Sequence, residues 1–420
     1  MATSKLDMHD DACAHGDLLP LDTALATYAR EIAALPSRRI ALNDALQQVL
    51  AAPVVATVDL PMFIQSAVDG YALRAEDLAA ATETTPVRLP LAGEVRAGVA
   101  PDAPLRAGET QRIFTGGRLP DGADTVARQE IVERDGEFAV LRRTLPLATD
   151  VRHRGEELRA GAELAQAGQK LHAGLLAALA MAGIAEVDVH RAPRVRVLVT
   201  GDEVMQAVPG DAGIFDANGP LLRSWFIERG HAAPRIDYVA DDRTQLRVAM
   251  NEALLDCDLL LTTGGVSVGD HDLVRPVAEE LGVREVFWRV AQKPGKPLYF
   301  GVRDDAGVRR LMLGLPGNPG AVLIGLHVHV AAMLAQLHAV RDPAPQWRAG
   351  RLAAAVRADA RDQLLRMRLR IDADGQIWLE RLGHQASHML SNLTAATALV
   401  RIPAGVALDT HAVVQWLPLP

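Results

Sequence analysis

The stretch at residues 259–272, LLLTTGGVSVGDHD, combines groups that could bind an anion with groups that could bind a cation. Its pattern predicts a buried apolar strand, a glycine-rich turn and the acidic start of a helix, which together form the strand–helix unit of a parallel sheet. Such turns expose backbone N–H groups, and the helix start adds partial positive charge, so anions bind there readily. Asp270 and Asp272 bring negative charge to the same place. The stretch therefore predicts a site that binds a phosphate or another oxyanion together with a divalent metal.

Charged residues after other predicted strands extend this candidate site. Carboxylates about 4 Å apart repel by roughly 4 kcal/mol at an effective dielectric near 20. They would take up protons unless a cation lay among them, and Mg²⁺ prefers oxygen ligands and commonly bridges to substrate phosphates. Taken singly, each carboxylate is explained as well by a helix cap or an exposed surface position. The set comprises the acidic residues Glu203, Asp241 and Asp272 and the basic pair Lys293 and Lys296, of which the lysines suit a second anion.

The elements that must position these residues lie between residues 193 and 340. Apolar strand patterns alternate there with helical patterns, which predicts a mostly parallel sheet covered by helices on both faces. Ligands of such sheets bind beyond the carboxyl ends of the strands. The glycine loops and acidic residues all fall at that edge, at positions 201–203, 241, 264–272 and 316–319.

The remaining chain predicts further domains, since 420 residues exceed one ordinary core. Short β-type runs alternate with turns at 86–143 and again after 345, which indicates a small inserted β-rich domain and a C-terminal β-barrel. The fold class is therefore multidomain α/β plus β, with a central three-layer α/β domain. The expected divisions are an N-terminal region at 18–190 with its β-rich insertion at about 60–150, the α/β domain at 191–340 and the barrel at 341–420.

Composition argues against several classes of function. A formal charge of −8 disfavours a nucleic-acid binder or a protein of acidic membrane surfaces. Because the chain has only two cysteines and no signal-peptide pattern, we expect the protein to lie in a reducing cytoplasm. The apolar segment 320–340 is long enough to cross a membrane, but its three histidines favour a helix buried against the sheet.

Familiar catalytic motifs are missing from the sequence, and two early residues are weaker candidates. The chain has no phosphate loop of the G-x-x-x-x-G-K type, no dinucleotide fingerprint, no nucleophile elbow and no H-E-x-x-H motif. Asp69 precedes a glycine, which by itself indicates a hairpin turn. Thr115 follows a predicted strand and could offer a hydroxyl to a ligand, although such a residue by itself is more often only part of a turn. The charged segment 151–158 is by default a solvated run.

Nine stretches, in order along nearly the whole chain, resemble the MoeA family of molybdenum-inserting enzymes, which is related to the E domain of gephyrin. SAVDGYA and GHQASH carry most of the specificity, because related pterin-binding adenylyltransferases have loops similar to the glycine-rich ones. The stretches are SAVDGYAL (66–73), IFTGGRLP (113–120), VRHRGEEL (151–158), TGDEV (200–204), IFDANGPLLR (214–223), TTGGVSVGDHD (262–272), KPGKP (293–297), LGLPGNP (313–319) and GHQASHML (383–390).

The resemblance implies a reaction and an assembly. Adenylylated molybdopterin and molybdate would give molybdenum cofactor and AMP, with Mg²⁺ as the metal. Molybdate is a doubly charged tetrahedral oxyanion, which suits lysine, arginine and hydroxyl donors. The family also implies a homodimer with active sites at the subunit boundary. Molybdopterin adenylyltransferase and cofactor-accepting molybdoenzymes are the other expected partners.

The resemblance also assigns roles to residues, with small departures from the family pattern. Glu157 stands where the family usually has Asp, Arg289 where some members have Lys, and Ala386 where a Gly usually precedes Ser387. The implied catalytic residues are Asp69, Thr115, Glu157, Glu203, Asp241 and Asp272, of which the last three would bind the metal. The implied substrate-binding residues are Thr200, Gly201, Gly264, Gly265, Ser267, Gly269, Arg289, Lys293, Lys296, Pro316, Gly317, Asn318, Pro319, Arg366 and Ser387.

Three alternatives remain open at this point. The preceding adenylyltransferase step is disfavoured because that enzyme needs only the central domain. A scaffold like the related gephyrin domain would tolerate Asp241→Asn, whereas an insertase should lose turnover. A homologue specialised for tungstate is compatible with the sequence, since the two oxyanions have nearly the same size and charge.

Overall fold

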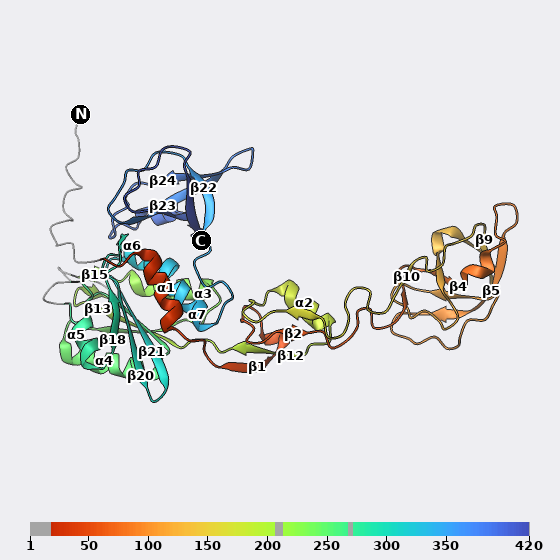
Figure 1. Cartoon of the computed structure of the whole chain (residues 1–420), viewed down its shortest axis with the longest axis horizontal. Helices are drawn as coiled ribbons and strands as arrows, with labels where there is room; N and C mark the ends of the chain where they lie inside the picture. Colours follow the sequence, from red (N-terminus) through yellow and green to blue (C-terminus); the bar gives the residue numbers. More distant parts are fainter. Residues whose placement is uncertain (1–17, 206–212, 268–271, 420) are drawn as a thin grey trace. The chain divides into compact units, whose positions relative to one another are not determined.

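The computed structural model describes residues 18–205, 213–267 and 272–419 (Figure 1). The chain divides into two compact units. Unit 1 contains the residues up to 38 and those from 190 onward, and unit 2 contains residues 39–189.

Unit 2 is dominated by a six-stranded mixed sheet with strand order β7-β4-β6-β5-β9-β8. Leu73, Leu89 and Leu141 pack in its core, which confirms the β-rich character predicted for this region. The strands are β4 Gly70–Leu73, β5 Val87–Val95, β6 Thr110–Ile113, β7 Thr125–Arg128, β8 Val132–Asp135 and β9 Phe138–Leu141. Its smaller elements are β2 Val54–Val55 with β11 Glu163–Ala165, β3 Gln65–Ser66 with β10 Val151–Arg152, and helix α2 Ala173–Met181.

The central sheet of unit 1 has strand order β16-β13-β17-β21-β20-β18. The first three neighbouring pairs are parallel and the last two are antiparallel, so the sheet is mostly parallel, as predicted. The strands that pair in parallel are β13 Val195–Thr200, β16 Arg235–Val239, β17 Leu259–Thr263 and β21 Val308–Leu315. Of the other two, β20 Tyr299–Asp305 runs against all the rest, and β18 Arg284–Trp288, which pairs antiparallel with β20, runs in the direction of the parallel strands.

Helices cover both faces of this sheet because successive strand side chains point to opposite sides. Val197 and Leu261 pack with one group of helices, whereas Leu198 and Leu260 pack with the other. The first group is α1 Leu21–Glu31, α3 Asn218–Glu228 and the long helical segment Pro319–Leu337; the second is α4 Arg243–Asp256 and α5 Val274–Glu280. The three-layer α/β architecture is therefore confirmed.

The long helical segment is buried in the core of unit 1. It consists of α6 Pro319–Ile324, a π-helical turn η4 Gly325–Val330 and α7 Ala331–Leu337. Among the residues that the structure describes, it is the one helix whose length and composition would suffice to cross a membrane, and 83% of its most apolar window is buried inside the protein. The predicted buried helix is confirmed.

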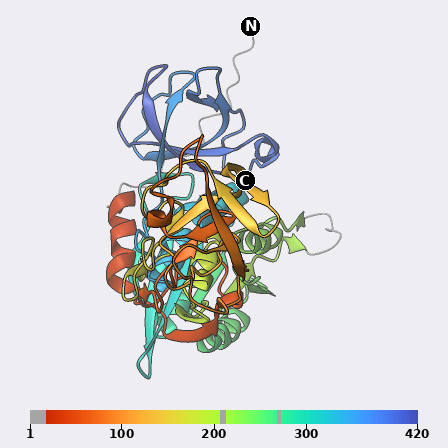
Figure 2. The ribbon, with the colours of Figure 1, turned by 90° about the vertical axis from the view of Figure 1, so that its right-hand side faces the viewer.

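Residues 348–418 form a closed five-stranded barrel, drawn in blue in Figures 1 and 2. Its strands follow the order β23-β24-β22-β26-β25, and β25 closes the circle by pairing with β23. The strands are β22 Arg348–Leu352, β23 Asp362–Ile371, β24 Ile377–Arg381, β25 Ala398–Ile402 and β26 Val413–Pro418. The short strand β19 Gln292–Lys293 pairs with β23, so the loop that contains it is attached to the barrel.

Helix α1 departs from the predicted domain division. The sequence analysis assigns residues 18–190 to one N-terminal region, yet the compact units divide near residues 38 and 190. Leu21, Ala24 and Tyr28 of α1 are buried in the core of the central sheet domain. The apolar stripe of this helix therefore belongs with the sheet, which a helical pattern by itself could not reveal.

Asp258 is the ion-pairing centre at the start of β17. Arg191 donates two hydrogen bonds to its carboxylate, of 2.6 and 2.8 Å, and the backbone N–H of Arg194 donates a third of 2.8 Å. Burial raises the pKa of this carboxyl, but these donors outweigh burial and lower its pKa to about 2. A buried carboxylate is thus held ionised where β13 and β17 begin.

The glycine turn after β17 lies directly against the end of β13. Gly264 has φ +91°, and a Cβ added there would lie 2.8 Å from Thr200 Oγ1 and 3.1 Å from the Thr200 carbonyl oxygen. Gly265 has φ +66°, and its Cβ would lie 2.8 Å from the Val274 side chain. Thr200 Oγ1 donates to the Thr263 carbonyl at 3.1 Å. Glycine is required here both by the left-handed backbone and by the close packing.

We expect stability to fall between pH 7.5 and 5.5 because two histidines are buried. Burial lowers the pKa of His327 and of His329 to about 3, with Arg229 adding to the effect at His327. The unfolded chain takes up protons below about pH 6.5, whereas the folded chain does not, so stability is lost as pH falls from about 6.5 towards about 3. At pH 5.5 each histidine should cost about 1 kcal/mol, measurable as a lower urea midpoint.

The variant His327→Leu supplies the control for this pH dependence. It removes one of the two groups, so its stability should depend less steeply on pH than that of the wild type over the same interval. Carboxylates with lowered pKa values, such as Asp258, lose stability only at more acidic pH. An unchanged wild-type midpoint between pH 7.5 and 5.5 would contradict the buried neutral state.

Gly264→Ala should destabilise the protein more than a matched glycine variant. Gly307, in the turn between β20 and β21, has φ +85°, and a Cβ added there would meet no atom within 4 Å. Gly307→Ala should therefore cost only the left-handed strain of about 1–2 kcal/mol. Gly264→Ala adds overpacking against Thr200, about 1–3 kcal/mol more. Equal losses in urea unfolding would show that the approach to Thr200 imposes no constraint.

Candidate functional site

The parallel strands of the central sheet end at the same level. Val199 lies opposite Thr263, and Thr263 lies opposite Leu315. At the other side of β13, Thr200 lies opposite Val239. The loops that follow these strands therefore start from one edge, as the sequence analysis predicted for the ligand-binding side of a parallel sheet.

Two of these loops are in contact and continue into a helix start. The Gly264 N–H donates to the Leu315 carbonyl at 3.1 Å, and a Cβ on Gly317 would lie 3.6 Å from Gly264 Cα. Asn318 is the residue before α6, and Pro319 is the first helical residue, where a fixed φ and a missing N–H are tolerated. The predicted residues Gly264, Gly317 and Asn318 thus lie together at the N-terminus of α6.

The acidic residues reach the same edge from separate loops. The carboxylate oxygens of Glu203 lie 2.7 Å from the position that a Cβ on Gly201 would take, so the missing Cβ of glycine leaves room for them. The Asp241 N–H donates to Asp202 Oδ1 at 3.0 Å, which joins the loop after β16 to the loop after β13. Asp272 is half-buried just before α5.

These carboxylates have the oxygen ligands that suit Mg²⁺, but they do not form a ready metal site. Among the residues that the structure describes, no group of three or more His, Cys, Asp or Glu side chains is arranged to hold a metal ion. The assignment of Glu203, Asp241 and Asp272 to magnesium therefore stays a prediction.

The basic residues of the site lie on the loop between β18 and β20. Lys293 Nζ forms an ion pair with Asp359 at 2.9 Å and remains half-exposed. The Lys296 carbonyl accepts from the Val290 N–H at 3.0 Å, so the loop 291–295 is a closed tip. Burial raises the pKa of Asp359, but Lys293 and the Arg361 N–H outweigh it and hold the pKa below its usual range.

Arg289 joins this loop to the glycine turn through a tryptophan. Its guanidinium lies 3.9 Å from the centre of the Trp288 ring, and Trp288 Nε1 donates to the Val266 carbonyl at 2.9 Å. Ser267 follows Val266 and is exposed. A guanidinium next to an indole ring gains a cation–π attraction, so Arg289 is held near the turn.

Arg366 supports the Ser387 loop from inside the protein. Its side chain is 1% exposed, and it donates to the carbonyls of Met389, His384 and Ala386 at 2.5, 2.9 and 3.0 Å. The Ser387 carbonyl in turn accepts from the Gly320 N–H at 2.8 Å, which docks this loop onto α6. Burial lowers the pKa of Arg366. Its predicted contact with substrate is not tested by these bonds.

The three predicted residues of unit 2 occupy two places. Asp69 Oδ1 accepts from the Thr115 N–H at 2.8 Å and from the Thr115 hydroxyl at 2.7 Å. These two donors and the nearby Arg112 hold the pKa of Asp69 below its usual range. The structure therefore brings Asp69 and Thr115 together. Glu157 is exposed in a separate turn, where its N–H donates to the Leu60 carbonyl at 3.0 Å.

Two predicted positions, Gly269 and Asp270, lie outside the described residues. The other predicted positions of unit 1 fall on the loops already named. Thr200 and Pro316 are buried at the ends of β13 and β21, whereas Gly201 and Gly265 are partly exposed.

Sequence reasoning did not single out Asp216, Asn218, Tyr238 and Trp288. Asp216 accepts from the Tyr238 hydroxyl at 2.6 Å and from the Asn218 N–H at 2.9 Å, and burial together with Asp216 raises the pKa of Tyr238 to about 12. Asn218 Nδ2 donates to the Gly317 carbonyl at 2.8 Å. An Asp two residues before a helix is a capping signal that could have revealed Asp216. The contact with Gly317 has no signal in the sequence.

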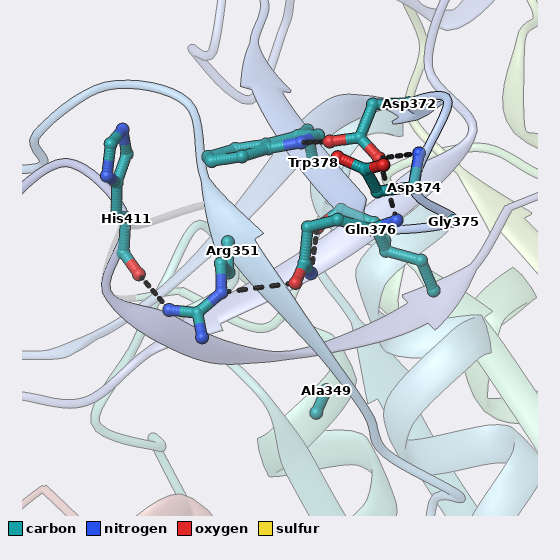
Figure 3. A pocket seen from close by; sticks show the side chains of 9 residues that line it. Ala349, Arg351, Asp372, Asp374, Gly375, Gln376, Trp378 and His411 are labelled. Carbon is teal, nitrogen blue, oxygen red and sulfur yellow. Dashed lines mark hydrogen bonds between the residues drawn. The ribbon is translucent and has the colours of Figure 1, made fainter.

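A surface pocket of about 570 Å³ lies elsewhere, on the barrel (Figure 3). Trp378 Nε1 donates to Asp372 at 2.6 Å, and Arg351 donates to Gln376 at 3.2 Å and to the His411 carbonyl at 3.0 Å. The lining residues are Ala349, Arg351, Asp372, Asp374, Gly375, Gln376, Ile377, Trp378 and His411, which include none of the predicted site residues. This hollow on the barrel is therefore separate from the predicted residues at the sheet edge.

Comparison with known proteins agrees with this organisation. Family models match in chain order: the MoeA N-terminal region (domain I and II) at residues 19–183, the probable molybdopterin binding domain at 196–336 and the MoeA C-terminal region (domain IV) at 349–419. A molybdopterin molybdenumtransferase from Synechococcus elongatus is 33% identical over 92% of this chain and 96% of its own length.

Two further proteins support the same assignment. A molybdopterin molybdenumtransferase from Nostoc sp. is 35% identical over 66% of this chain and 64% of its own length. The crystal structure of a molybdopterin biosynthesis MoeA protein from Pyrococcus horikoshii is 28% identical, covers 96% of this chain and 99% of its own, and superposes with a TM-score of 0.78. The chain therefore belongs to the MoeA family of molybdopterin molybdenumtransferases, enzymes of molybdenum cofactor biosynthesis.

Proposed function

We propose that this enzyme inserts molybdenum from molybdate into adenylylated molybdopterin and releases AMP. The observation that supports this most is the gathering of three kinds of group at one sheet edge. The glycine turn at 264–265 meets the N-terminus of α6, carboxylates follow β13 and β16, and the lysine loop 293–296 lies between β18 and β20. A phosphorylated pterin and a second oxyanion need such a combination.

Different groups of this protein would bind the two anions. Backbone N–H groups near Gly264 and the start of α6 would bind a phosphate, since helix starts attract anions. Lys293 and Lys296 would bind the second oxyanion, and Ser387 would offer a hydroxyl. Arg289, beside Trp288, adds a positive charge near the turn. Held in this way, the two anions would be oriented towards each other, which would lower the entropic cost of their reaction.

We propose that Mg²⁺ binds together with the substrate rather than to the protein alone. The described residues hold no ready group of three ligands, and Mg²⁺ is commonly bound by one or two carboxylates plus substrate phosphates. Glu203, Asp241 and Asp272 are the carboxylates that would take part. When bound, the metal would polarise the phosphate bond between the pterin and AMP.

We also propose a cytoplasmic homodimer in which Asp69, Thr115 and Glu157 contribute to the reaction. Asp69 is held ionised by Thr115, so the pair offers a fixed negative charge beside a hydroxyl. The proposed partners are molybdopterin adenylyltransferase, which would supply the adenylylated substrate, and the molybdoenzymes that accept the cofactor.

The purified protein should release AMP from adenylylated molybdopterin in the presence of Mg²⁺, and molybdate should be required. Asp241→Asn should lower the rate by about 100-fold, because one of the carboxylates that would hold Mg²⁺ is lost. The matched control is Asp242→Asn. Asp242 accepts from the Gln245 N–H at 2.8 Å as the cap of α4, and Asn caps a helix about as well.

Two outcomes would overturn the proposed reaction. Tight binding of the pterin without AMP release under any condition would favour a scaffold or binding protein. Release that responds to tungstate but not to molybdate would change the metal that is inserted. Equal losses in Asp241→Asn and Asp242→Asn would remove the special role of Asp241.

Metal binding should depend on the nucleotide-bearing substrate. With Mn²⁺ as a paramagnetic probe, we expect at least about tenfold tighter binding when adenylylated molybdopterin is present, because its phosphate oxygens complete the coordination shell. Glu203→Gln should abolish most of this gain, whereas Glu285→Gln should not, since Glu285 of β18 forms an ion pair with Arg275 of α5. Equally tight Mn²⁺ binding without the substrate would contradict the proposal.

A further inference from the structure

A buried chain of hydrogen bonds runs from α1 to the lysine loop. The Tyr28 hydroxyl lies 2.9 Å from His329 Nδ1, and His329 Nε2 lies 2.8 Å from Gln292 Oε1. Gln292 Nε2 then donates to the Gly295 carbonyl at 3.2 Å. Tyr28, His329 and Gln292 are each 0% exposed. The four groups therefore interact in the absence of competing solvent.

In this series of hydrogen bonds, the donor and the acceptor of each bond can be assigned in only one consistent way. The Gly295 carbonyl can only accept, so the amide N–H of Gln292 must face it and the amide oxygen must face His329. That oxygen also can only accept, so His329 carries its proton on Nε2. Nδ1 is then unprotonated and accepts a hydrogen bond from the Tyr28 hydroxyl. The imidazole is thus held as one neutral tautomer by its two neighbours.

The π-helical turn η4 carries this histidine in the middle of the long buried helix. π-turns are rare and frequently occur at functional sites. The same turn holds His327, which is also buried but has different surroundings: it contacts Arg229 at 3.2 Å and Trp225 of α3. His327 and His329 therefore share burial and helix position, but only the hydrogen bonds of His329 lead towards the lysine loop.

Gln292 fills the inside of the lysine loop. A Cβ on Gly295 would lie 2.7 Å from Gln292 Nε2, so the amide lies against the backbone of the tip. The base of the loop is closed by the bond from the Val290 N–H to the Lys296 carbonyl, at 3.0 Å. The tip therefore depends on the Gln292 side chain for its internal contact, and the two lysines flank that contact.

We propose that His329 is a positioning residue of the reaction, which fixes Gln292 and through it the places of the Lys293 and Lys296 ammonium groups. The inference rests on the proposed function, in which these lysines bind the oxyanion. Tyr28 acts in the same chain by holding the acceptor side of the imidazole. His329 contacts no reacting group itself.

The test compares His329→Leu with His329→Gln in the full-length enzyme. Leucine fills the space but cannot donate to Gln292, whereas the amide N–H of glutamine can take the place of the imidazole Nε2–H. We expect His329→Leu to raise the KM for molybdate by about tenfold, with kcat changed less than about threefold, since loss of a charge-positioning bond weakens binding by this order. His329→Gln should restore most of the affinity.

A second measurement needs no turnover. Amide hydrogen exchange in the segment 289–298 should become about tenfold faster in His329→Leu, because the bonds at Val290 and Arg289 close this loop. Gln292→Met, which keeps the length of the side chain but loses both hydrogen bonds, should accelerate the same segment. The matched control is His327→Leu, which removes an equally buried histidine from the same turn and should change neither KM nor loop exchange.

The outcomes separate this inference from the proposed function. A wild type without molybdate-dependent AMP release would overturn the proposed function, and exchange in 289–298 would still decide whether His329 fixes the loop. An active wild type whose His329→Leu variant keeps both its KM and its loop exchange would overturn the inference. The same changes in His327→Leu as in His329→Leu would also overturn it, because they would report only loss of core packing.

Discussion

The register of β13, β17 and β21 is the constraint on which the candidate site depends. Because Val199, Thr263 and Leu315 lie level, the loops that follow them begin at one height and can touch. The glycine turn lies so close to the end of β13 that a Cβ on Gly264 would overlap with Thr200. A register shift of one residue would reverse the faces of a strand and separate its loop from its neighbours. The packing of both sheet faces therefore also fixes the site.

The central domain stabilises this register with polar groups that are paired inside its core. Asp258 forms ion pairs with arginines where β13 and β17 begin. The hydrogen bonds between Tyr28, His329 and Gln292 link α1, the long helical segment and the lysine loop. Buried polar groups are costly when unpaired, so each such pairing favours one arrangement of helices over its alternatives. The lysine loop is stabilised in the same way, because its internal hydrogen bond from Gln292 to the Gly295 carbonyl is buried in this core.

The sequence predicted the parts of the fold that follow from local patterns. Strand and helix periodicity located the central sheet, its covering helices and a buried helix at 320–340, which the structure places at 319–337. The glycine loops fall at one edge of the sheet, as predicted, and their role in binding a ligand stays a prediction. Contacts that depend on tertiary placement were beyond it: the Asn218 amide on the Gly317 carbonyl, Trp288 on the Val266 carbonyl, and the burial of α1 in the sheet domain. In each case the residues lie far apart in sequence and carry no shared periodicity, so only packing decides that they meet.

The ion pair between Lys293 and Asp359 shows how the site can remain stable without its ligands. The Lys293 ammonium, which the proposed function assigns to an oxyanion, is balanced by the Asp359 carboxylate at 2.9 Å. The pair is half-exposed on the lysine side, where such contacts contribute only about 0–1 kcal/mol, so an incoming oxyanion can replace the carboxylate at little cost. In the proposed reaction the carboxylates on separate loops at the sheet edge would meet the cation together with the substrate, since Mg²⁺ is commonly bound by one or two carboxylates plus substrate phosphates.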